Sequence, residues 1–117
     1  MIEVLPASRS NRLGLRFSGT LTAEERERVY VPQVEQILKS HGSIRLLLHL
    51  DEDFAGGESG AFDGAFLGRH IDQFEKVAVI GAADRLFPVK LASRSMKGDL
   101  RVFEPGQVQE AWRWLEQ

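Results

Sequence analysis

Apolar residues follow one another along this chain in patterns that predict five strands. Residues 13–17 alternate apolar with small or polar side chains, which is typical of a strand with one buried face. Residues 44–50 form a nearly continuous apolar run, which is typical of a strand buried on both faces. Shorter apolar segments predict the remaining strands at residues 2–5, 77–80 and 100–103, and the first two strands along the chain form a potential hairpin.

Four further segments have the spacing or the end signals of helices. Thr22 and Glu25 stand in the order of a capping box, in which each side chain bonds to the other residue's backbone amide. Gly42 is a good C-terminal stop for this first helix. Pro32 lies inside the helix, where it removes one backbone hydrogen bond, so we expect a kink there. The other expected helices run from about residue 59 to 73, from 84 to about 95, and from 108 to 115.

The order of these elements is ββαβαβαβα. Strands that alternate with helices imply a largely parallel sheet with right-handed crossovers, and the opening hairpin makes the sheet mixed. We therefore expect a single α/β domain over residues 1–117, with a mixed sheet of about five strands and about four helices, mostly on one side of the sheet.

The composition narrows the classes of function. The chain carries 15 basic and 17 acidic residues, a net charge of −2, whereas proteins that bind duplex nucleic acid usually have a clear basic excess. It has no cysteine, and therefore neither disulfides nor thiolate chemistry. No apolar run approaches the about 20 residues that span a bilayer, and the first 12 residues lack the apolar run of a secretion signal. We expect a soluble, cytoplasmic protein with no transmembrane segment that binds no nucleic acid.

The segment GGESGAFDGAFLGRH, residues 56–70, raises the question of chemistry. A phosphate-binding loop would need a lysine directly after its second glycine, and neither Gly60 nor Gly64 is followed by one. A nucleophile turn would need a glycine two positions after Ser59, where Ala61 stands. The three histidines of the chain lie far apart and form no metal-ligand spacing. We therefore expect no catalytic motif, no metal site and no cofactor.

Close packing of a helix explains these glycines better. Gly60, Gly64 and Gly68 recur every four residues and share one helical face, at a cost of up to about 1 kcal/mol each relative to alanine. Such a ridge indicates that a sheet, a helix, a ligand or a partner approaches this face closely. Phe62 and Phe66 supply the apolar packing beside it.

Six short segments carry a resemblance to a known family. They are MIEVL at residues 1–5, VPQVE at 31–35, IRLLLHLD at 44–51, FEKVAVIG at 74–81, VFEP at 102–105 and AWRWL at 111–115. Their order and spacing resemble the SpoIIAA-like family of STAS/SEC14-type domains over essentially the full chain. The resemblance implies the α/β fold expected above, and it contains no catalytic motif.

At the start of the second helix the resemblance implies a regulatory serine. STAS domains typically carry Asp-Ser-[Ser/Thr]-Gly there, and phosphorylation of the serine controls binding to a kinase partner. Ser59-Gly60 matches the end of this pattern, whereas Gly57-Glu58 stands in place of the aspartate and the first serine. Ser59 is therefore the candidate phosphosite of a partner-switching regulator, and Glu58 would mimic a fixed negative charge beside it.

The SEC14-like relatives imply an apolar pocket between the sheet and the helices. We expect the pocket or a partner surface to include Phe54, Ser59, Gly60, Phe62, Gly64, Phe66 and Phe87. Relatives often carry a tryptophan-rich stretch after the fourth strand, and residues 82–89 of this chain, AADRLFPV, depart from that pattern.

Two surface features are candidates for contacts with partners. A basic patch in and after the third helix, either solvated or facing an anionic headgroup or acidic partner, comprises Arg85, Lys90, Arg94, Lys97 and Arg101. The last helix carries Trp112 on its core face and Trp114 off that face, and Trp114 is the candidate interface of a homodimer.

Taken together, these features favour a non-catalytic binding module for a small apolar or amphipathic, lipid-like ligand, or for a protein partner. The alternative is the partner-switching regulator with Ser59 as its phosphosite. A third class is an enzyme that would show a shifted pKa in a cleft at one of four residues, namely His49, Asp51, Asp53 or His70.

Overall fold

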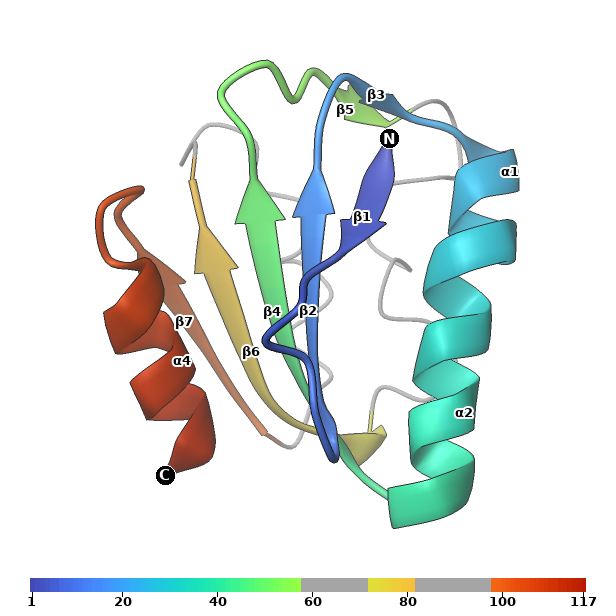
Figure 1. Ribbon diagram of the computed structural model, residues 1–117, viewed down its shortest axis with the longest axis vertical. Helices are drawn as coiled ribbons and strands as arrows, with labels where there is room; N and C mark the ends of the chain where they lie inside the picture. Colours follow the sequence, from blue (N-terminus) through green and yellow to red (C-terminus); the bar gives the residue numbers. More distant parts are fainter. Residues whose placement is uncertain (58–71, 82–97) are drawn as a thin grey trace.

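A five-stranded mixed sheet forms the centre of the protein. The computed structural model describes residues 1–57, 72–81 and 98–117. The strands lie in the order β1-β2-β4-β6-β7, where β1 pairs antiparallel with β2 and the remaining pairs are parallel (Figure 1). Their bounds are Ile2–Val4 for β1, Arg12–Phe17 for β2, Ile44–Leu50 for β4, Phe74–Ile80 for β6 and Asp99–Phe103 for β7. The expected mixed sheet with its opening hairpin is confirmed.

Parallel pairing brings the carboxyl ends of four strands to one edge of this sheet. Phe17, at the end of β2, pairs with Leu50 at the end of β4. Ile80, at the end of β6, pairs with His49 on one side and with Phe103 on the other. Residues that directly follow these strands therefore lie near one another, although they are far apart in the sequence.

A second, two-stranded sheet was not predicted by the sequence pattern. It pairs β3 (Thr20–Leu21) in parallel with β5 (Gly56–Gly57) beyond the carboxyl ends of β2 and β4 (Figure 1). The amide of Ala55 donates to the carbonyl of Gly19 at 2.8 Å and extends the pairing. Two-residue strands are too short to produce a recognisable apolar period, which is why periodicity does not reveal them.

The first helix begins at a threonine cap, as expected, but the capping box is only half formed. The hydroxyl of Thr22 accepts from the amide of Glu25 at 3.1 Å, at the start of α1 (Ala23–Glu25). The Glu25 carboxylate instead accepts from the amide of Ile2 at 3.0 Å and lies 3.4 Å from the amino terminus at Met1. Glu25 therefore ties the helix to the edge strand β1 rather than closing its own cap.

Pro32 is accommodated by a π-helical turn that stands directly before it. This turn, η1 (Arg26–Tyr30), leads into α2 (Val31–His41), and the amide of Val31 donates to the carbonyl of Arg26, five residues earlier. A π turn pairs amides with carbonyls five residues earlier instead of four. This shift in the hydrogen-bond pattern allows a proline, which lacks an amide, at the start of α2. Gly42 ends α2 in the left-handed conformation at φ 78°, as expected of a helix stop.

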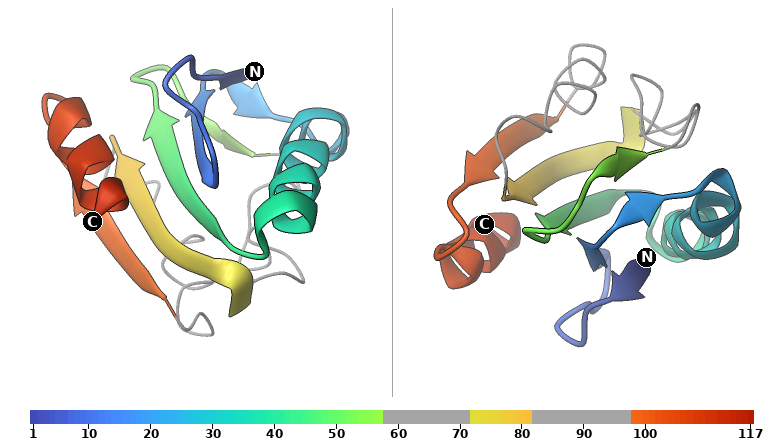
Figure 2. Two further views of the ribbon diagram at one scale, coloured as in Figure 1. Left: turned by 60° about the horizontal axis from the view of Figure 1, so that its bottom comes forward. Right: turned by 90° about the horizontal axis from the view of Figure 1, so that it is seen from above.

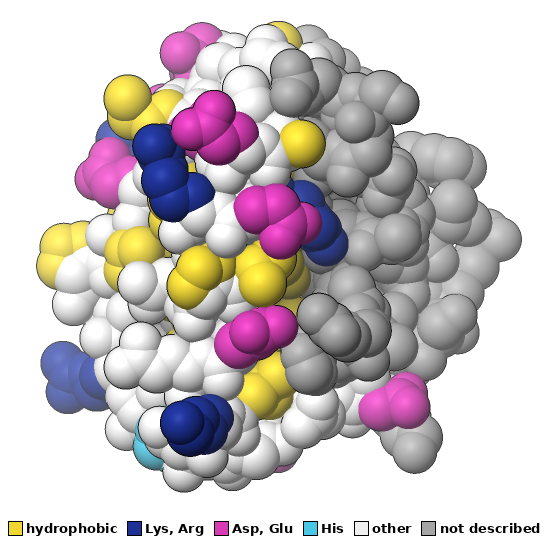
Figure 3. All heavy atoms as spheres, turned by 90° about the vertical axis from the view of Figure 1, so that its right-hand side faces the viewer, with side chains coloured by type: hydrophobic (Ala, Val, Ile, Leu, Met, Phe, Trp, Pro, Cys, Tyr) yellow, Lys and Arg dark blue, Asp and Glu magenta, His cyan; other side chains and the backbone are white. Residues whose placement is uncertain are grey.

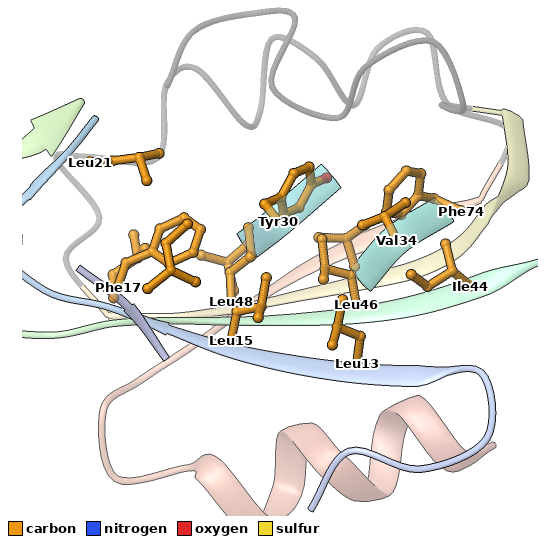
Figure 4. Packing of buried hydrophobic residues seen from close by; sticks show 14 of the residues in the cluster. Leu13, Leu15, Phe17, Leu21, Tyr30, Val34, Ile44, Leu46, Leu48 and Phe74 are labelled. Carbon is orange, nitrogen blue, oxygen red and sulfur yellow. The ribbon is translucent and has the colours of Figure 1, made fainter. Parts of the chain in front are cut away.

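The two described long helices cover opposite faces of the sheet (Figure 2). On one face, Leu13, Leu15 and Phe17 of β2 pack with β4 and with Tyr30 and Val34 of the first helix (Figure 4). On the other face lies α4 (Val108–Glu116). The expected helices at residues 59–73 and 84–95 lie outside the described residues, apart from residues 72 and 73, so the full element order and the helix count stay predictions.

The last helix is placed by a close approach to the sheet. A Cβ added at Gly14 in β2 would lie 2.6 Å from the Trp112 ring, so this strand position has no room for a larger residue. Ala111 and Leu115 are fully buried on the same face of the helix. The core face predicted for α4 is thus the one that packs on the sheet. Among the residues that the structure describes, no helix is long and apolar enough to cross a membrane.

Candidate functional site

A cleft of about 550 Å³ opens at the carboxyl ends of β4, β6 and β7. Three loop beginnings line it: residues 49–52 at the end of β4, Gly81 after β6, and residues 102–105 at the end of β7. In open α/β sheets, ligands bind outside the carboxyl ends of the strands. The volume lies within the range of about 300–1,000 Å³ that is usual for small-molecule sites.

Four of the described residues that line the cleft are apolar. Leu50 and Phe103 line it and are only 3% and 8% exposed, because they also belong to the two cores. Val102 lines it as well and is 39% exposed, which makes it one of the few large apolar side chains of the described residues that remain open to solvent. Pro105 completes the apolar lining. A ligand with an apolar body would cover surface that is otherwise wet.

Gly81 allows the backbones of β4 and β6 to approach each other beside the cleft. Its φ is 129°, in the region that favours glycine. A Cβ at this position would lie 2.5 Å from the Leu50 carbonyl oxygen. The amide of Gly81 donates to the Phe103 carbonyl at 3.4 Å. The glycine therefore holds the loop beginnings of three adjacent strands together.

The rim of the cleft is acidic and carries one histidine. Asp51, Glu52 and Glu104 line it together with His49, and none of the described lining residues is a lysine or an arginine. The side chain of Asp51 accepts from the Glu52 amide at 2.9 Å. The rim is therefore suited to a ligand group that donates hydrogen bonds or carries positive charge.

Arg16 on β2 fixes the charge of Asp51. Its guanidinium bonds to the Asp51 carboxylate at 2.5 Å, and this bond lowers the pKa of Asp51, helped by the amide of Glu52. The same pair raises the pKa of Arg16. Asp51 is consequently ionised near neutral pH, and Arg16 is already engaged by it.

His49 is held in its neutral form. Partial burial lowers its pKa most, and the positive charge of Arg16 lowers it further, while Asp51 opposes the change. The register places His49 beside Arg16, with one on β4 and the other on β2. A neutral imidazole at the rim can both donate and accept a hydrogen bond.

Of the predicted ligand-site residues, the structure describes Phe54. Phe54 is 2% exposed, and its ring lies 5.8 Å from that of Phe17, so it packs in the core, and its contact with a ligand stays a prediction. The other members of the expected site lie outside the described residues, namely Ser59, Gly60, Phe62, Gly64, Phe66 and Phe87. The same holds for the basic-patch residues Arg85, Lys90, Arg94 and Lys97.

Trp114, the candidate interface residue, is half-buried against its own domain. Its ring packs on Phe103 at 5.9 Å between centroids. The Lys76 ammonium lies 5.0 Å from the ring centroid, and the Arg101 guanidinium lies 5.7 Å from it. Two cation–π contacts and a ring contact therefore engage this tryptophan within the chain. Its role in a homodimer stays a prediction.

Sequence reasoning named His49 and Asp51 only as parts of the enzymatic alternative, and it missed Val102, Glu104 and Pro105 as site residues. The signal that connects them is topological: each stands at or just after the end of a strand in a parallel sheet. Across the part of the chain that the structure describes, no group of three histidine, aspartate or glutamate residues is arranged to hold a metal.

Comparison with known proteins agrees with this architecture. The crystal structure of an uncharacterised protein of the DUF3478 family with a SpoIIAA-like fold, from Shewanella loihica PV-4, superposes with a TM-score of 0.71. The match has 23% sequence identity and covers 98% of this chain and 92% of the other. No curated protein matches the sequence. The SpoIIAA-like family model matches residues 12–116, and the chain therefore belongs to the SpoIIAA-like family.

Proposed function

We propose that this protein is a non-catalytic binding module that takes a small amphipathic ligand into the cleft at the carboxyl edge of its sheet. The observation that supports this most is the combination of apolar and acidic residues in the described lining of the cleft. Burial of apolar surface supplies about 25 cal/mol per Å², and the rim groups orient the polar end of the ligand.

The polar end of the ligand is a hydrogen-bond donor or a cation. Glu52 and Glu104 would repel an anionic headgroup, and none of the described residues that line the cleft is a lysine or an arginine. Arg16 and Asp51 offset each other's charge through their ion pair, so the unbalanced negative charge of the rim comes from Glu52 and Glu104. An amine or a hydroxyl at the end of an apolar chain therefore suits the site better than a carboxylate or a phosphate.

The enzymatic alternative uses some of the same residues. It expects a shifted pKa in a cleft, and both His49 and Asp51 line this cleft with lowered pKa values. These shifts leave the His49 imidazole neutral and the Asp51 carboxylate ionised. Both forms suit hydrogen bonding to a ligand as well as they suit catalysis. None of the described residues that line the cleft carries a hydroxyl, thiol or amine nucleophile, so we base the proposal on binding.

Native mass spectrometry of protein purified without detergent tests the proposal. We expect an added small mass on the wild-type chain. Val102→Asp replaces an apolar lining residue of the cleft with a charged one and should remove that mass. Val4→Asp is the matched control, because Val4 is also 39% exposed on an edge strand but belongs to β1, far from the cleft. Equal added mass in both variants would count against the cleft as the binding site.

Membership of the SpoIIAA-like family supports a second candidate, a partner-switching regulator in which Ser59 is phosphorylated. Ser59 follows β5 by two residues along the chain. A phosphate there adds about −1.5 to −2 charge. The test is phosphopeptide mapping of protein from its native host, combined with a partner pulldown of Ser59→Asp. An unmodified Ser59 and an unchanged set of partners would remove this candidate.

A further inference from the structure

A second, polar hollow lies at the other end of the sheet, where β2 begins and α2 ends. It has a volume of about 240 Å³ and lies between the β1–β2 turn and the C-terminal half of α2. The side chains that give it its character are Arg9, Ser10 and Arg12 from the turn, and Gln36, Ser40 and His41 from the helix. Figure 3 faces α2, and basic side chains and a histidine gather at its lower end.

The hollow concentrates hydrogen-bond donors in a chain that is acidic as a whole. The net charge of the protein is −2, yet none of the described residues that line this hollow is an aspartate or a glutamate. Among the ion pairs formed within the described residues, none involves Arg9 or Arg12. Two arginines thus line one hollow whose described lining residues include no carboxylate to neutralise them.

The turn that presents these arginines is held firmly. Arg9 and Arg12 exchange two backbone hydrogen bonds, at 3.0 and 2.9 Å. Ser10 between them has φ 55°, a left-handed conformation that only a few per cent of non-glycine residues adopt. The carbonyl of Asn11 accepts from the amide of Arg45 at 2.8 Å, which ties the tip of the turn to β4. The two arginines therefore extend from a fixed backbone, which reduces the entropy lost on binding.

The carboxylate that contacts this turn is already occupied. Glu75 accepts from the Asn11 side-chain amide at 3.2 Å and from the Ser43 hydroxyl at 3.2 Å. It also accepts from the Arg45 guanidinium at 3.3 Å. Its charge is balanced by these partners and leaves the two arginines of the hollow unneutralised.

We propose that this hollow is a binding site for a phosphate-type oxyanion, either free phosphate or the phosphate group of a small phosphomonoester. Guanidinium groups bind such oxyanions through paired hydrogen bonds, and serine hydroxyls, glutamine amides and an imidazole add further donors. The hollow is smaller than the about 300–1,000 Å³ of sites for larger organic ligands, so it suits a compact anion. This site is separate from the cleft and does not depend on the function proposed there.

NMR titration of the full-length chain with sodium phosphate and with glycerol 3-phosphate tests this site. We expect saturable shifts of the amides in residues 8–13 and 33–41, with at most small shifts in sodium chloride of equal ionic strength. Arg9→Gln and Arg12→Gln should each weaken the affinity about tenfold or more, the size expected for a charge-assisted hydrogen bond. Arg113→Gln, an exposed arginine on α4, is the matched control and should leave the affinity unchanged.

The two ligands identify the source of the anion. Binding of both phosphate and glycerol 3-phosphate supports a site for the phosphate group itself. Binding of glycerol 3-phosphate alone supports a site that also contacts the group attached to the phosphate. Shifts that chloride reproduces, or an affinity that neither single variant changes, would overturn the proposal.

Discussion

Gly81 occupies a position that other residues tolerate poorly. Its φ of 129° is unfavourable for alanine, and an alanine Cβ there would lie only 2.5 Å from the Leu50 carbonyl oxygen. We expect Gly81→Ala to lower the free energy of unfolding by about 2–4 kcal/mol, from backbone strain and overpacking together. Urea unfolding measures this change. Gly106→Ala, where a Cβ meets no neighbour within 4 Å, is the control and should be nearly neutral.

His49 gives the stability of the fold a pH dependence of defined sign. Its pKa in the folded protein lies below the reference value of 6.5, mainly because the ring is partly buried. As the pH falls below that value, the unfolded chain takes up the proton first, so stability is lost with falling pH.

For Asp51 the stabilising contribution is present above its reference pKa of 3.8 and is lost as the pH falls through its lowered folded value. The two effects therefore occupy separate ranges of pH.

A titration of the imidazole signals by NMR checks this assignment directly. We expect the His49 pKa to lie below 6.5 and the melting temperature of His49→Gln to fall less than that of the wild type between pH 7 and pH 5. An imidazole pKa at or above 6.5 would show that His49 is protonated more readily than the structure indicates.

At the scale of elements, the end of α4 is held by two cations from the sheet. Arg45 Nη1 bonds to the Leu115 carbonyl and, at 3.2 Å, to the Gln117 carbonyl. Lys76 Nζ bonds to the Trp114 carbonyl at 2.8 Å. The last carbonyls of a helix lack intrahelical donors and form the negative end of its dipole, so these contacts fasten the helix to β4 and β6.

Removing one of these cations should loosen α4. We expect Arg45→Met to lower the free energy of unfolding by about 1–3 kcal/mol, because charge-assisted hydrogen bonds to the helix end are lost. Hydrogen exchange should quicken first in the amides of residues 111–116. Arg113→Met, on the exposed side of the same helix, should change neither quantity. Equal effects of the two substitutions would show that the contacts with the helix end contribute little.

Elements with a clear apolar period were predictable from the sequence, and elements set by backbone geometry were not. The five main strands, the stop at Gly42 and the core face of α4 follow from the spacing of apolar residues and from one glycine. Pro32 has no backbone amide to donate, so the sequence predicts a disturbed helix near it. The sequence does not predict that the disturbance takes the form of a π turn. The pairing of β3 with β5 involves two residues on each side, too few for any period.

At the scale of the whole molecule, the candidate site arises from topology. His49, Gly81 and Glu104 lie near one another only because β4, β6 and β7 run parallel and end at the same edge. The local motifs instead predicted a ligand site built from phenylalanines. One of these, Phe54, lies in the core, where its ring packs on Phe17. A parallel sheet was predictable from the sequence, but the residues that its edge brings together became clear only from the strand order and register.

The central claim is that the cleft binds amphipathic ligands with a donor or cationic end. The most direct test is an NMR titration of the chain with octylamine and, separately, with octanoate, which has the same apolar chain and the opposite charge. We expect octylamine to produce saturable shifts in residues 49–52, Gly81 and residues 102–105, with octanoate binding at least tenfold more weakly because like charges oppose it at the rim. Equal binding of the two, or shifts that fall elsewhere, would contradict this claim.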